Sequence, residues 1–128
     1  MSHGLDLGPI ARVELACRDL SRQRDFYARI LGLPARGGHE TRFRIGQVEL
    51  VLRPRGDALF PRANEARTSE VGALLAFPVP PQELDRWHRR MLSARVAVLD
   101  APGQAGAPPR VLRVADSEGN VVELFAQP

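Results

Sequence analysis

Hydrophobic and polar positions at the start of the chain predict a strand followed by a helix. Residues 10–17 alternate in polarity, which places Val13, Leu15 and Cys17 on one face of a strand. A hydrophobic stripe at helical spacing follows and predicts a helix, which Asp19 or Ser21 can cap and Gly32 can end. The stripe consists of Phe26, Tyr27, Ile30 and Leu31.

A hairpin is predicted next, from strands at 41–45 and 48–53 joined by Gly46-Gln47. Glycine in the first turn position fits a type II′ turn. Such a turn fixes the register, so Arg44 lies opposite Glu49 on the polar face. The apolar face then carries Phe43, Ile45, Val48 and Leu50.

The second half of the chain repeats this order of elements. Residues 71–79 predict a strand, Pro80-Pro81 opens a second helix, and residues 95–99 predict a short strand. Strands at 110–114 and 121–126 flank a turn. The second helix carries apolar side chains at the spacing i, i+3, i+4, i+7 and i+8: Leu84, Trp87, His88, Met91 and Leu92.

Both halves therefore form similar modules, at about 10–53 and 71–126, joined by a connector at 54–70 that is rich in Pro, Arg and small residues. Each half is too small to bury a sheet face well, so we expect the two to share a sheet or a core in a single domain over 1–128. A duplicated ferredoxin-like sandwich has a similar element order. The additional hairpin in each half favours a larger, curved sheet.

Composition indicates a globular protein. The 128 residues are 44% hydrophobic and 26% charged, and no apolar stretch approaches the roughly 20 residues of a membrane helix. Residues 1–8 lack the pattern of a secretory signal, so we expect a cytoplasmic protein without a membrane partner. The single cysteine, Cys17, cannot form an internal disulfide and is interpreted as a packing residue.

The charge pattern argues against a nucleic-acid partner. All 18 basic residues are arginine, and 15 acidic residues leave a net charge of +3. No basic run exceeds two residues and acids are interleaved throughout, whereas phosphate binding needs clustered positive charge.

Two motifs resemble those of the vicinal oxygen chelate superfamily, which includes glyoxalase I, bleomycin-resistance proteins and extradiol dioxygenases. The opening motif is Ile10-Ala-Arg-Val-Glu-Leu-Ala-Cys-Arg-Asp-Leu20, followed by Phe26-Tyr27 and Leu31-Gly32-Leu33. The closing motif, Asp116-Ser-Glu-Gly-Asn-Val-Val-Glu-Leu124, is similar to the family's Asp-Pro-Asp-Gly-Asn-x-x-Glu-Leu. The resemblance spans residues 10–126. It implies an α+β fold of two βαβββ modules that form a curved mixed-sheet cup, with the helices on the outside.

The resemblance also implies a metal site, and this sequence departs from it. The two family histidines fall at Arg12 and Leu74, while the family acids are present as Glu49 and Glu123. A guanidinium has no free lone pair and stays protonated, so Arg12 cannot be a ligand, and neither can Leu74. A catalytic divalent ion usually has at least three protein ligands. We therefore expect no metal and no other cofactor, with a divalent metal on Glu49 and Glu123 as the alternative.

Our hypothesis is that Arg12 replaces the ion by pairing with Glu123, Glu49 or both, because an unpaired buried glutamate is desolvated at a high cost or becomes protonated. Other interpretations stay open. A cross-strand pair with Arg44 accounts for Glu49 without any function, and Arg12 can be an ordinary solvated strand residue. The register of strand 110–114 leaves the face of Arg113 undecided.

The sequence predicts first a metal-independent protein that sequesters or senses a small anionic or aromatic ligand. Its ligand-binding residues are Arg12, Arg44, Glu49 and Glu123 as polar groups, with Val51, Leu74, Ala76 and Phe125 as an apolar wall. One alternative is a glyoxalase-like lyase or isomerase, or a dioxygenase, with a degenerate or displaced metal site and Glu123 as its catalytic base. Another is an accessory interaction module. The resemblance also implies a homodimer, because family members commonly complete their cups by pairing or swapping modules.

Overall fold

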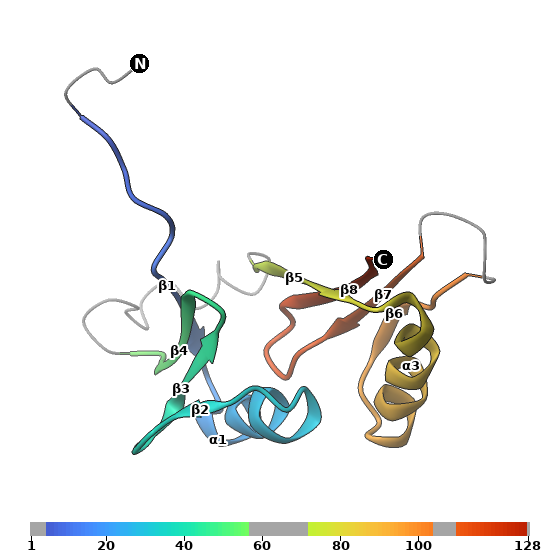
Figure 1. The fold of residues 1–128 in the computed structure, drawn as a ribbon. Coiled ribbons are helices and arrows are strands. Elements are labelled where there is room, and N and C mark those ends of the chain that lie inside the picture. Colours follow the sequence, from blue (N-terminus) through green and yellow to red (C-terminus); the bar gives the residue numbers. More distant parts are fainter. Residues whose placement is uncertain (1–4, 57–71, 104–109, 128) are drawn as a thin grey trace.

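Two modules of the same topology make up the computed structural model, which describes residues 5–56, 72–103 and 110–127 (Figure 1). The first contains β1 (Arg12–Cys17), α1 (Leu20–Asp25), the π-helix η1 (Phe26–Ile30), β2 (Ala35–Arg36), β3 (His39–Ile45) and β4 (Val48–Pro54). The second contains β5 (Leu74–Val79), the 3₁₀ helix η3 (Pro81–Glu83), α3 (Leu84–Ser93), β6 (Val98–Asp100), β7 (Val111–Ala115) and β8 (Val121–Ala126). Most of the predicted connector at 54–70 lies outside the described residues.

The strand orders confirm the internal repeat and the α+β fold. One sheet has the order β1-β4-β3-β2 and the other β5-β8-β7-β6. In each sheet the first strand pairs in parallel with the last strand of its module, and the remaining pairs are antiparallel.

The predicted hairpin has the predicted register. Arg44 lies opposite Glu49, Phe43 opposite Leu50 and Ile45 opposite Val48. Gly46 has φ +58°, the left-handed value that the first position of a type II′ turn requires.

The apolar stripe predicted for the first helix is buried, and the second half of this helix is the π-helix η1. The Asp19 side chain accepts a hydrogen bond from the Arg22 backbone N–H and so caps α1. In η1 the Leu31 N–H donates to the Phe26 carbonyl, five residues earlier, at 2.9 Å. The chain leaves the helix at Gly32, whose φ is +75°.

The apolar face of the second helix is narrower than predicted. Leu84 and Met91 are fully buried, but Leu92 is 56% exposed. At 3.6 residues per turn, Leu92 is rotated by roughly 80° from Leu84, which places it beyond the edge of the buried stripe. None of the helices in the described parts of the chain has the length and apolar character needed to cross a membrane.

Some strand bounds differ from the prediction. The strand predicted at 95–99 begins at Val98, because the backbone before it ends α3: the Val96 N–H donates to the Met91 carbonyl at 3.0 Å. The two-residue strand β2 was not predicted, since two residues cannot show an alternation.

Buried polar groups on α1 and η1 join the two modules at the turn between β7 and β8. The Asp116 Oδ2 atom accepts hydrogen bonds from Gln23 Nε2 and Tyr27 OH, both at 2.7 Å, and from Asn120 Nδ2 at 2.9 Å. Burial, followed by the charge of Asp116, raises the pKa of the Tyr27 phenol far above its usual range. The core is one cluster with members from both modules, and it lies on the helix-covered faces of the sheets.

Candidate ligand-binding site

Each sheet has a second face, away from the core, and the predicted ligand residues lie there. We call these face A, on the sheet of β1–β4, and face B, on the sheet of β5–β8. The side chains of face A include Arg12, Glu14, Ala16, Arg36, Arg42, Arg44, Glu49, Val51 and Arg53. Those of face B are Leu74, Ala76, Pro78, Asp100, Val111, Arg113, Ala115, Val121, Glu123 and Phe125.

Two arginines hold the buried Glu49 on face A. Arg36 Nη1 lies 2.7 Å from Oε2, and Arg42 Nη1 lies 3.0 Å from Oε1. The hydrogen bond from Arg36 is the largest cause that lowers the pKa of Glu49, which is therefore ionised at neutral pH. Arg44 lies across the ladder from Glu49 as predicted, but it is not the residue that pairs with it.

A second cluster on face A surrounds Glu14. Arg12 Nε lies 2.6 Å from Glu14 Oε2, and Arg53 Nε contacts the other carboxylate oxygen. The hydrogen bond from Arg53 is the largest cause that lowers the pKa of Glu14.

The predicted pairing of Arg12 with Glu49 or Glu123 is therefore wrong. Arg12 lies beside Glu49 in the register of β1 and β4, but Arg36 and Arg42 already hold both oxygens of that carboxylate. Glu14, two residues along the same strand face, accepts from Arg12 instead.

Face B has a third cluster, around Glu123. β7 pairs with β8 so that Arg113 lies opposite Glu123, which resolves the register that the sequence left open. Arg113 bridges two acids: its Nε lies 2.9 Å from Glu123 Oε1, and its Nη1 lies 2.9 Å from Asp100 Oδ2.

Apolar side chains flank these clusters. On face B, Leu74 is 53% exposed, Ala76 is exposed and Phe125 is half-buried. On face A, Val51 is buried without belonging to the core cluster. The eight predicted ligand residues thus divide equally between the two open faces.

Sequence reasoning did not predict which charged residues pair on these faces, and it left the face of Arg113 undecided. The pairing partners that it missed are Glu14, Arg36, Arg42, Arg53 and Asp100. Alternation along β1 and β4 places Glu14 and Arg53 on the face of Arg12, so this signal was present. No such signal existed for Arg36, because its short strand could not be predicted.

Comparisons with known proteins identify the family. Residues 9–124 match the profile of the Glyoxalase/Bleomycin resistance protein/Dioxygenase superfamily. The chain belongs to this superfamily. No curated protein matches it in sequence.

Solved structures of similar fold match nearly the whole length of this chain. A glyoxalase/dioxygenase from Nostoc punctiforme has a TM-score of 0.71 and 22% identity, with 99% of each chain covered. A virulence protein from Salmonella typhimurium has a TM-score of 0.71 and 19% identity, with 97% of this chain and 100% of that chain covered. A lactoylglutathione lyase from Agrobacterium tumefaciens has a TM-score of 0.69 and 19% identity, with 94% of each covered. At these identities the likeness concerns the fold.

The superfamily's divalent metal does not fit the residues present. Guanidinium groups hold both oxygens of Glu49 and one oxygen of Glu123. The positions at which the resemblance implies the family histidines are Arg12 and Leu74, and neither side chain can be a ligand. In the described residues, no group of three or more His, Cys, Asp or Glu side chains is placed to hold a metal ion. A divalent ion would also have to displace cations from the acids that it needs.

Face A keeps an excess of positive charge after its internal pairing. Among the residues that the structure describes, five arginines surround two glutamates on this face. Arg44 is exposed, and its side chain has no hydrogen-bond or ion-pair partner within the described residues. Glu40, the next alternate residue on β3, pairs with Arg24 of α1 instead.

Proposed function

We propose that this superfamily member is a metal-independent small-molecule binding protein that takes a small anion on face A. The observation that carries the proposal is the arginine clustering: two arginines hold each glutamate of face A, and among the described side chains of this face five arginines accompany two glutamates. Sequestration or sensing of the anion is the role that such binding supports.

The chemistry of arginine favours an oxyanion. The planar guanidinium donates two parallel hydrogen bonds to a carboxylate, phosphate or phosphonate and remains charged at every physiological pH. Glu14 and Glu49 orient four of the arginines, which reduces the side-chain entropy lost when a ligand binds. The Arg44 guanidinium has no partner in the described residues, so all of its N–H groups can donate to a ligand.

A titration with phenylphosphonate in the presence of EDTA tests this proposal. We expect the ligand to raise the melting temperature and to bind saturably by calorimetry. Arg44→Gln should weaken binding about tenfold, as expected for the loss of one charge-assisted hydrogen bond of about 1.5 kcal/mol. Arg86→Gln, on the exposed surface of α3, is the matched control and should bind like the wild type. No saturable binding of the anion, or equal effects of the two substitutions, would contradict the proposal.

We also propose that two copies of the chain complete the site by placing face A of one copy against face B of the other. Several residues on these faces are open to solvent in the single chain: Leu74 is 53% exposed, and the side chains of Arg12 and Arg36 are 54% and 53% exposed. The charges are complementary, because face A has an excess of positive charge whereas Glu123 and Asp100 outnumber Arg113 on face B.

Light scattering coupled to size exclusion tests the dimer. Leu74→Arg adds a positive charge to face B, which the proposed dimer places against the arginines of face A, so we expect it to yield a monomer. Leu92→Arg, an equally exposed leucine on α3, should leave the dimer intact. A wild-type protein that is monomeric at concentrations of about 100 μM would contradict the proposed assembly.

A further inference from the structure

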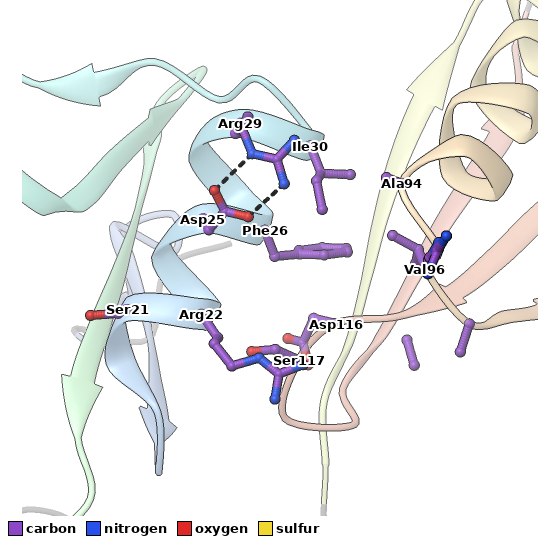
Figure 2. A pocket seen from close by; sticks show the side chains of 13 residues that line it. Ser21, Arg22, Asp25, Phe26, Arg29, Ile30, Ala94, Val96, Asp116 and Ser117 are labelled. Carbon is purple, nitrogen blue, oxygen red and sulfur yellow. Dashed lines mark hydrogen bonds and ion pairs between the residues drawn. The ribbon is translucent and has the colours of Figure 1, made fainter.

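A hollow lies on the helix side of the molecule, and among the described residues of faces A and B only Ala115, at the end of β7, also lines it. It has a volume of about 520 Å³ and lies between the first helix, the segment 94–97 and the turn after β7 (Figure 2). Small-molecule sites typically have volumes of about 300–1,000 Å³. The hollow is therefore large enough for a ligand with one or two rings.

The inner wall of this hollow is apolar. Phe26 and Ile30 project from η1 toward Val96 on the opposite side (Figure 2). Phe26 and Ile30 are buried, and Ala94, Ala97 and Ala115 complete this wall. A flat apolar group could therefore pack against the Phe26 ring.

Three arginines also line the hollow, and two of them have no acidic partner in the described residues. Arg29 holds Asp25 through two hydrogen bonds of 2.8 Å (Figure 2). The Asp116 carboxylate accepts hydrogen bonds from the side chains of Gln23 and Tyr27. Arg22 and Arg95 lack a side-chain hydrogen bond or ion pair in the part of the chain that the structure describes. The lining as a whole therefore carries one excess positive charge.

Arg95 occupies a backbone position where glycine is usual. The Val96 N–H donates to the Met91 carbonyl and the Arg95 N–H to the Leu92 carbonyl, which is the hydrogen-bond pattern of a Schellman motif. Arg95 has φ +60° and is the one non-glycine residue with a positive φ in the described residues. A side chain at this position costs stability, so a guanidinium is retained beside the hollow at an energetic disadvantage.

We propose that this hollow binds a monoanion with a flat apolar body, of the aromatic carboxylate class. The carboxylate lies at the unpartnered guanidinium groups of Arg22 and Arg95, and the ring packs against Phe26, Ile30 and Val96. The site is separate from the anion site of face A and does not depend on it.

An NMR titration of the ¹⁵N-labelled protein with 2-naphthoate tests the proposal. We expect saturable shifts of the backbone amides of Phe26, Val96, Ala97 and Ser117. The uncharged analogue 2-naphthylmethanol should bind at least tenfold more weakly, because it lacks the carboxylate. Shifts confined to face A or face B, or equal affinities for the two compounds, would overturn the proposal.

Substitutions at Arg95 separate binding from folding. Arg95→Gly relieves the left-handed backbone, so it should raise the melting temperature by about 2–5 °C and yet weaken 2-naphthoate binding at least tenfold. Arg22→Gln should weaken binding to a similar extent, while Arg89→Gln on the exposed surface of α3 should not. If Arg95→Gly binds 2-naphthoate as tightly as the wild type, the proposal is wrong.

Discussion

At the scale of single residues, Asp116 shows how a motif that marks the family serves the fold. Its carboxylate accepts five hydrogen bonds: three from the side chains of Gln23, Tyr27 and Asn120, and two from the backbone N–H groups of Glu118 and Asn120. Gln23 and Tyr27 belong to the first module, whereas Asp116 belongs to the second. The closing motif that carries the family resemblance therefore stabilises the contact between the modules.

Asp116→Ala should lower the free energy of unfolding by about 3–5 kcal/mol, because it leaves several buried donors without an acceptor. Urea denaturation measures this loss. Ser117→Ala is the control, since it removes one hydrogen bond to Gln23 and should cost about 1 kcal/mol. A loss below about 1 kcal/mol in Asp116→Ala would contradict the role of Asp116 in joining the modules.

Cys17 yields a prediction about pH. Burial is the largest cause that raises the pKa of its thiol from 9.0 to about 12. The unfolded chain releases this proton near pH 9 while the folded chain retains it, so stability should fall as the pH rises above 9. Denaturation at pH 8 and pH 10 measures the effect, and Cys17→Ala should show a smaller fall between the two. The native thiol should also react with Ellman's reagent at pH 8 far more slowly than the unfolded thiol.

At the scale of elements, the sequence predicted best where a local signal fixes the backbone. Gly46-Gln47 determined the register of the hairpin, and β8 has the predicted bounds 121–126. The strand after α3 was displaced because residues 94–96 end the helix, which hydrophobic alternation does not show. The pairing of the arginines was unpredictable for a related reason: Arg36 reaches Glu49 from a strand that the pattern did not reveal.

Gly46→Ala tests the hairpin turn. Because Gly46 has φ +58°, an added Cβ atom should destabilise the fold by about 1–2 kcal/mol. Gly37→Ala is the matched control: its φ is not positive and a Cβ atom there meets nothing within 4 Å. Equal melting temperatures of the two variants would show that the turn does not require a left-handed residue.

At the scale of the whole molecule, two modules of the same topology carry different open faces. Face A carries arginines around Glu14 and Glu49. Face B combines three apolar residues with two acids, Asp100 and Glu123; the apolar residues are Leu74, Ala76 and Phe125. All eight predicted ligand residues lie on these faces, because alternation determines the face of each strand residue. It did not reveal which arginine holds which glutamate, since that depends on how the strands are placed side by side.

The ion pairs predict acid sensitivity. Hydrogen bonds from arginines lower the pKa values of Glu14, Glu49 and Asp25. A lowered folded pKa contributes stability above the unfolded value, 4.5 for glutamate, and this stability is lost as the pH falls below it. The melting temperature should therefore decline below about pH 4.5, and the decline should be smaller in Arg36→Gln. A melting temperature that is constant down to pH 3 would contradict these pairings.

The most direct test of the central claim, that arginines hold the two acids which the family resemblance places at metal-ligand positions, is the metal content of protein purified without chelators. Elemental analysis by mass spectrometry should find Zn, Ni, Mn and Fe each far below one ion per chain, in the wild type and in Glu49→Gln alike. A near-stoichiometric metal in the wild type, lost in Glu49→Gln and in Glu123→Gln, would contradict the account.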